Sequence, residues 1–192
     1  MLACSHVARK GIYMDNVFFQ SDRLLYRPYC MDDLKTVHKQ FNEASRRRWF
    51  YFQEPDCLTL EFAEKEIQKR MEVCSHKVNL LKDDFGLGIA LKDTGELIGF
   101  IGLSKFHGPE EEIENVEIGY QIGEAYQGKG YATEAVKAAV QWGLIELKRL
   151  GGEPKIVAKI EHENWPSRRV AEKAGLTFVH AEKYVSVYEI CE

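Results

Sequence analysis

Gln127-Gly128-Lys129-Gly130-Tyr131-Ala132 is the stretch that decides how this chain folds and what it binds. It follows an apolar segment, 116–122, that predicts a strand, and it opens a segment to about residue 147 that predicts a helix. Two glycines allow a sharp turn whose backbone N–H groups face outward. The helix that begins there adds unpaired N–H donors and the positive end of its dipole. A strand, a glycine-rich turn and a helix N-terminus together predict an anion site, most often for phosphate.

The remaining elements follow from periodicity, caps and turns. An apolar stripe runs along 132–147, Thr59 and Asn164 are predicted caps, Gly175 is a predicted helix stop, and Asp93-Thr94-Gly95 predicts a hairpin. The predicted strands cover 23–27, 85–91, 96–105, 115–122, 155–160, 176–179 and 184–190, and the other predicted helices cover 31–42, 59–73 and 164–174. Antiparallel strands followed by a strand-helix-strand-helix-strand set predict an α/β fold, a mixed sheet with helices on its faces. Residues 1–20 show little pattern and are interpreted as an N-terminal extension, so that 21–192 form a single domain.

Composition excludes several classes of protein. The net charge of −4 and pI near 5.9 argue against general nucleic-acid binding, which leaves a basic footprint. No apolar run approaches the roughly 18 residues of a membrane span, and residues 1–19 lack the apolar core of a signal peptide. The five cysteines are an odd number without a Cys-x-x-Cys pair, which favours free thiols in a cytoplasmic protein and neither a disulfide framework nor a metal site.

Two nucleotide-binding motifs resemble the glycine stretch and are not complete. Residues 123–129 read Gly-x-x-x-x-Gly-Lys, but Gly130 stands where a P-loop needs the Ser or Thr that holds magnesium. The dinucleotide-binding fingerprint requires a third glycine, and Thr133 occupies that position. A P-loop enzyme is therefore a distant alternative.

The motifs resemble those of the GNAT acetyltransferase superfamily, and within it the RimJ/RimL branch. The stretch from Gln127 to Ala135 is similar to that branch's acetyl-CoA pyrophosphate motif, and Glu117-Ile118-Gly119-Tyr120 is similar to the preceding strand. Asn164-x-x-Ser167-x-Arg169-x-x-x-Lys173-x-Gly175 is similar to the second motif, and Arg23-Leu24-x-x-Arg27-Pro28 to the opening strand. The resemblance covers roughly residues 20–190 and implies the GNAT fold, a mostly antiparallel central sheet with helices on both faces, and acetyl-CoA as co-substrate.

The resemblance also implies a set of residues that bind the acetyl-CoA. They lie on the strand, the glycine turn and the start of the second helix: Tyr120, Ile122, Gln127, Gly128, Lys129, Gly130, Tyr131, Ala132, Thr133 and Asn164. Tyr120 and Ile122 would offer backbone groups to the pantetheine arm as an added strand does. Asn164 also suits a simple helix cap, and Lys129 a solvated side chain.

Two residues are candidates for the proton transfers. Glu117 interrupts an apolar strand, where a carboxylate is costly unless it is paired or useful, so it is the predicted general base; the alternative is a solvent-facing strand residue. Ala171 stands where many GNAT enzymes place a tyrosine acid, so the resemblance shifts the acid role to Ser167, with a capping role as the alternative. Glu124 and Leu176 also replace the proline and phenylalanine that the family often has.

Arg46-Arg47-Arg48 followed by Trp49-Phe50-Tyr51-Phe52 is an unusual segment. Basic residues beside aromatic ones can bind nucleic acid, but the acidic chain argues against it. The alternatives are an exposed helix end followed by inward-packing residues, or a loop that lines the acceptor pocket, as the resemblance implies.

The sequence therefore predicts an N-acetyltransferase that moves acetyl from acetyl-CoA directly to a primary amine, without a metal. Protein N-termini, polyamines, aminoglycosides and amino-acid-like metabolites remain open as acceptors, and the protein is expected as a monomer or homodimer. The alternative from another class is a non-catalytic acetyl-CoA-binding module, which would need neither Glu117 nor Ser167.

Overall fold

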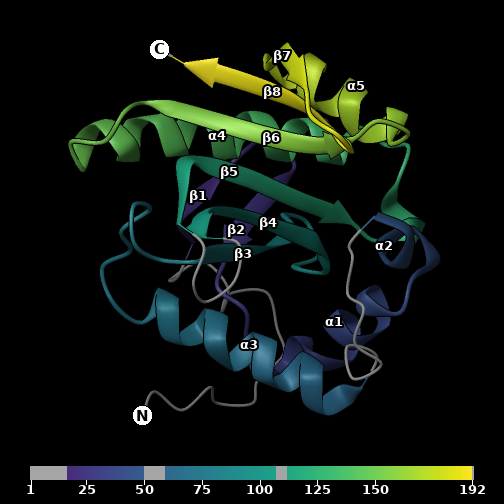
Figure 1. Cartoon of the computed structure of the whole chain (residues 1–192). Helices are drawn as coiled ribbons and strands as arrows, with labels where there is room; N and C mark the ends of the chain where they lie inside the picture. Colours follow the sequence, from purple (N-terminus) through teal and green to yellow (C-terminus); the bar gives the residue numbers. More distant parts are fainter. Residues whose placement is uncertain (1–16, 50–58, 107–111, 192) are drawn as a thin grey trace.

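A computed structural model describes residues 17–49, 59–106 and 112–191. Eight strands form one sheet in the order β1-β2-β3-β4-β5-β6-β8-β7 (Figure 1). The strands are β1 (Phe19–Gln20), β2 (Leu24–Arg27), β3 (Phe85–Leu91), β4 (Leu97–Phe106), β5 (Glu112–Ile122), β6 (Lys155–Glu161), β7 (Thr177–Ala181) and β8 (Val185–Cys191). The predicted mixed α/β architecture is confirmed.

One parallel pair interrupts the otherwise antiparallel sheet of the described residues. This pair, β5 and β6, is joined only at Val116↔Ile156 and Glu117↔Val157. Beyond Glu117 the two strands no longer pair, whereas β5 continues in regular register with β4 to Ile122. The β6-facing edge of residues 118–122 is therefore left without a strand partner in the described part of the chain.

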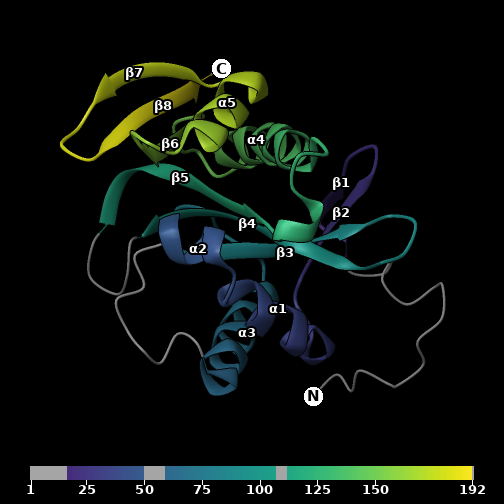
Figure 2. The same ribbon diagram turned by 90° about the vertical axis from the view of Figure 1, so that its right-hand side faces the viewer.

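Helices cover both faces of the sheet. On one side lie α4 (Tyr131–Arg149) and α5 (Trp165–Ala174); on the other lie α1 (Leu34–Phe41), preceded by the 3₁₀ turn η1 (Met31–Asp33), and α3 (Leu60–Cys74) (Figure 2). The apolar stripe predicted for α4 is buried against the sheet. A Cβ at Gly143 would stand 2.8 Å from Leu103 and 2.9 Å from Ile156, so glycine lets this helix approach the strands.

The local signals for helix ends are confirmed. Thr59 caps α3 by accepting a hydrogen bond from the N–H of Phe62 at 3.1 Å, and Asn164 caps α5. Gly175 ends α5 in the left-handed conformation, with φ of 102°. Asp93-Thr94-Gly95 joins β3 to β4 as the predicted hairpin.

The sheet begins earlier than the predicted domain boundary. Phe19 and Gln20, which sequence analysis places in the extension, pair with Tyr26 and Leu25 as strand β1. The Phe19 ring stacks on Trp142 of α4 with centroids 5.1 Å apart. Residues 1–16 lie outside the described residues, so for them the extension stays a prediction. Within the described part of the chain, no helix is long and apolar enough to cross a membrane.

Candidate active site

The glycine turn connects the end of β5 to the start of α4 through the short 3₁₀ turn η3 (Glu124–Tyr126). Gly128 and Gly130 have φ of 76° and 81°, a left-handed conformation that favours glycine. The first helical hydrogen bond of α4 runs from the N–H of Glu134 to the carbonyl of Gly130 at 3.1 Å. The N–H groups of 131–133 therefore have no partner within the helix, and no described side chain caps it. This end of α4 has the N–H donors that the predicted anion site requires.

Arg23 and Glu134 brace this turn from the side of β2. The Arg23 backbone N–H and Nε each donate to the Glu134 carboxylate at 2.7 Å, and Arg23 Nη1 donates to the Lys129 carbonyl at 3.1 Å. Burial by itself raises the pKa of Glu134, but the hydrogen bonds from Arg23 and Ser21 outweigh it and lower that pKa. The charged partners thus fix the turn without occupying its N–H groups.

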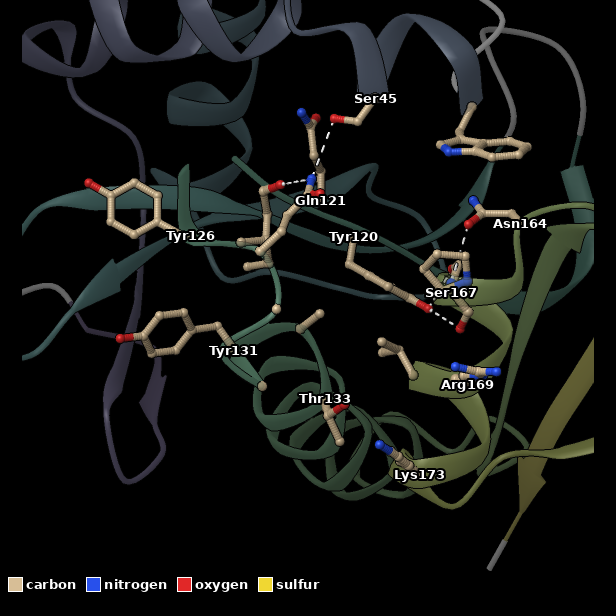
Figure 3. Close-up of a pocket in the computed structure, with 18 of the residues that line it drawn as sticks. Ser45, Tyr120, Gln121, Tyr126, Tyr131, Thr133, Asn164, Ser167, Arg169 and Lys173 are labelled. Carbon is tan, nitrogen blue, oxygen red and sulfur yellow. Dashed lines mark hydrogen bonds between the residues drawn. The ribbon is translucent and has the colours of Figure 1, made fainter. Parts of the chain in front are cut away.

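A cavity of about 430 Å³ opens from the turn between β5 and α5 (Figure 3). Its walls come from five parts of the chain, namely the helix α2 (Ala44–Trp49), the end of β5, the glycine turn, the start of α4 and the start of α5. Of the predicted acetyl-CoA ligands, all but Lys129 line it: Tyr120, Ile122, Gln127, Gly128, Gly130, Tyr131, Ala132, Thr133 and Asn164. Lys129 points elsewhere, with Nζ donating to the Ala125 carbonyl at 3.2 Å.

Tyr120 and Ser167 form a hydrogen-bonded pair in the cavity wall. The Tyr120 hydroxyl lies 2.7 Å from Ser167 Oγ and donates to the Ser167 carbonyl at 2.9 Å (Figure 3). Burial raises the pKa of Tyr120 to about 12, although the hydrogen bond with Ser167 acts in the opposite direction. The pair therefore keeps two neutral hydroxyl groups beside the cavity, and either can supply a proton. The sequence predicts only backbone contacts for Tyr120.

The start of α5 contributes both a cap and two cations. Asn164 Oδ1 accepts a hydrogen bond from the N–H of Ser167 at 3.2 Å. Asn164 therefore caps α5, which was the alternative role for this residue. Its side chain also lines the cavity, so capping does not exclude a contact with a ligand. Arg169 and Lys173, one turn of helix apart, line the same wall. Cations facing the N-terminus of α4 make this end of the cavity favourable for phosphate.

The helix α2 brings part of the Arg-rich segment to the cavity. Arg46 is buried, donates through Nη1 to Gln121 Oε1, and stacks on Phe41 with 4.1 Å from its guanidinium carbon to the ring centroid. Ser45, Arg46 and Trp49 line the cavity, whereas Arg47 and Arg48 are exposed. Arg46 and Trp49 thus agree with the pocket-lining alternative and Arg47 and Arg48 with an exposed helix end, and 50–58 lie outside the described residues.

Glu117 lies outside the cavity wall. Because β5 is regular from 117 to 122, Glu117 shares a face with Gln121, which contacts α1 and α2, while Tyr120 faces α5. The Glu117 side chain is 11% exposed, and its Oε1 lies 3.6 Å from Lys159 Nζ. It stands at the last residue pair that joins β5 to β6. The structure therefore places the predicted base, Glu117, on one face of β5 and the predicted acid, Ser167 of α5, beside the opposite face.

Nine residues that line the cavity were not singled out as site residues from the sequence, and four of them carry a charge or an amide: Arg169, Lys173, Gln121 and Arg46. Arg169 and Lys173 belong to the second motif, and their spacing of four could have placed them together on one face of that helix. Gln121 and Arg46 carry no such signal, because the contact that positions them joins β5 to α2. Among the described residues, no cluster of three or more histidine, cysteine, aspartate or glutamate side chains could hold a metal.

Comparisons with known proteins agree with this geometry. Residues 23–177 match the family described as acetyltransferase (GNAT) domain. The Bacillus subtilis (strain 168) protein YkkB, itself uncharacterized, is 31% identical over 181 residues, 88% of this chain and 92% of YkkB. An acetyltransferase from Agrobacterium tumefaciens shares the fold, with a TM-score of 0.67, 24% identity and coverage of 96% and 99%. So does Mycobacterium smegmatis RimJ in complex with CoA-disulfide, with a TM-score of 0.67, 17% identity and coverage of 88% and 81%. The chain therefore belongs to the GNAT acetyltransferase family.

Proposed function

We propose that this protein transfers acetyl from acetyl-CoA directly to a primary amine. The observation that carries the proposal is the cavity that joins the glycine turn and the N-terminus of α4 to the free edge of β5. A phosphate-bearing molecule with a long, hydrogen-bonding arm fits a cavity with these two features. Acetyl-CoA has both, and its acetyl group lies at the end of that arm.

The phosphate groups would lie at the turn. Gly128 has no described atom within 4 Å of the place where a Cβ would stand, so its backbone is open to a close approach. The N–H groups of 131–133 supply donors, and Arg169 and Lys173 supply charge from the facing wall. These groups match a pyrophosphate better than a magnesium nucleotide, because Gly130 offers no hydroxyl to a metal.

The arm would pair with the β6-facing edge of residues 118–122, as an added strand pairs with a sheet. An arm that runs along this edge, starting at the turn, places the thioester near Glu117, where β5 and β6 meet. Positioning of amine and thioester supplies much of the rate in such a transfer. A backbone N–H at this edge of β5 would stabilise the oxyanion that forms as the amine attacks.

Glu117 would take the ammonium proton, directly or through one water, from the α1-facing side of β5. Ser167, hydrogen-bonded to Tyr120, or water would protonate the departing thiolate from the cavity side. Their positions on opposite faces of β5 fit these roles, since the attacking amine and the leaving sulfur lie on different sides of the carbonyl carbon.

Two measurements test the proposal and separate it from a non-catalytic binding module. Calorimetric titration with acetyl-CoA measures binding, with ATP and magnesium as the control ligand. Release of the CoA thiol in the presence of a panel of amines measures transfer. Binding of acetyl-CoA without release with any amine would favour the binding module, and binding of ATP with magnesium at equal affinity would contradict both.

A further inference from the structure

An amine of the protein itself stands beside the proposed base. Lys159 lies on β6, two residues beyond the last pair with β5, on the same face of the sheet as Glu117. Its Nζ lies 3.6 Å from Glu117 Oε1 and 3.4 Å from Oε1 of Glu182, which follows β7. The Lys159 side chain is 36% exposed, so solvent reaches it although both carboxylates hold it.

Lys159 Nζ lies where an acceptor amine would have to lie, close to the proposed base. A general base acts on a proton that it reaches by a hydrogen bond of about 2.6–3.2 Å or through one water. At 3.6 Å, the Lys159 nitrogen needs only a small side-chain movement to meet this condition. A lysine has several rotatable bonds, and this one sits where β5 and β6 have separated, which is where the thioester would arrive.

We infer that Lys159 is a site of self-acetylation, an inference that rests on the proposed function. Glu117 takes one proton from the Lys159 ammonium, and the neutral nitrogen attacks the thioester carbonyl carbon. The new N–C bond forms as the C–S bond breaks, and the bonding electron pair leaves with sulfur. The nitrogen gives up its second proton as the amide forms, and the thiolate takes up one proton from Ser167 or water. The products are acetyl-Lys159, the CoA thiol and one released proton.

The modification would change the site that produces it. An acetylated lysine carries no charge, so both ion pairs, to Glu117 and to Glu182, are lost. Before modification, the Lys159 ammonium competes with an acceptor ammonium for the same carboxylate. Acetylation of Lys159 therefore removes this competitor, and the acetyl group shows that an amine at this position reaches the thioester.

The test is intact-mass and peptide mass spectrometry after incubation of the full chain with acetyl-CoA and no added amine. We expect one acetyl group, on Lys159, at a rate independent of protein concentration because the reaction is within one molecule. Lys159→Arg keeps the ion pairs and removes the acetyl group from the spectrum. Glu117→Gln slows the modification at least about 10-fold, as loss of a positioned base does.

Lys155 provides the matched control. It lies on the same strand and face as Lys159, four residues earlier, and its Nζ pairs with Glu189 at 3.0 Å. Lys155→Arg leaves the acetylation of Lys159 unchanged. Equal acetylation of Lys155 and Lys159, or an unchanged rate in Glu117→Gln, overturns the inference by showing a non-enzymatic reaction. A protein that stays unmodified but releases CoA with external amines overturns the inference alone. A protein that stays unmodified and does not bind acetyl-CoA overturns the proposed function.

Discussion

Gly128→Ala, compared with a control glycine, distinguishes the folding cost of a left-handed residue from the loss of a phosphate-binding site. The added Cβ would meet no described protein atom within 4 Å, so the mutant is not crowded. Its only cost to folding is the left-handed backbone at φ of 76°, about 1–2 kcal/mol for a residue other than glycine. For a domain of this size, that lowers the thermal midpoint by about 2–8 °C.

Gly151 is the control for this change. It has φ of 74°, no atom within 4 Å of a Cβ, and a position just after the other end of α4, away from the cavity. Gly151→Ala therefore has the same backbone cost. Only Gly128→Ala places a methyl group where the backbone N–H groups would meet phosphate, and losing one hydrogen bond to a charged group costs about 1.5–3 kcal/mol. This corresponds to about 10- to 100-fold weaker binding of acetyl-CoA.

Calorimetric titration of both mutants with acetyl-CoA, together with their melting curves, completes the experiment. We expect similar melting temperatures and very different affinities. If the two mutants bind acetyl-CoA equally well, the glycine turn does not hold the phosphates and the proposed orientation of the ligand is wrong. If Gly128→Ala unfolds while Gly151→Ala does not, the turn has a structural role that its open surroundings do not explain.

Four further substitutions test other parts of the structure. Glu117→Gln should lower kcat about 10²-fold, less at high pH where more amine is neutral, with acetyl-CoA affinity retained in a titration; an unchanged kcat would assign the base role elsewhere. Ser167→Ala should lower kcat about 10-fold, and Tyr120→Phe should reproduce part of that loss by removing the partner hydroxyl; an effect on KM alone would leave Ser167 a capping residue. Asp33→Ala should reduce the free energy of unfolding by about 3–5 kcal/mol in denaturant melts, because Arg27 is buried with it in a two-point ion pair of 2.7 and 2.9 Å; a loss below 1 kcal/mol would show that water or another group replaces the carboxylate.

The parts of the fold with strong local signals could be predicted from the sequence. The turn at Asp93-Thr94-Gly95 fixes the β3–β4 hairpin, and Asn164 and Gly175 mark the two ends of α5 within one residue. The stripe on α4 predicts its buried face, because a helix of this length must cover an apolar stripe. In each case, residues close in sequence determine the result.

Elements that depend on distant contacts were missed. The strand β1 has only two residues, and its place depends on Trp142, against which Phe19 stacks. The helix α2 consists of Ala-Ser-Arg-Arg-Arg-Trp, which shows no apolar face. Burial of Arg46 is possible because Gln121 and Phe41 satisfy it from other elements. No local pattern contains these partners.

The relative placement of Glu117 and Tyr120 could have been predicted from the sequence. Residues 117 and 120 of one strand lie on opposite faces because side chains alternate, so Glu117 and Tyr120 point to opposite sides of β5. What the sequence could not supply is the separation of β5 from β6 directly after Glu117, which depends on the register of two distant segments. That separation leaves the edge of residues 118–122 without a strand partner among the described residues, and it gives each face of β5 a distinct role in the proposed reaction. CoA would occupy the α5 side, where Tyr120 and Ser167 lie, and the amine would reach the thioester from the α1 side, where Glu117 and Lys159 already meet.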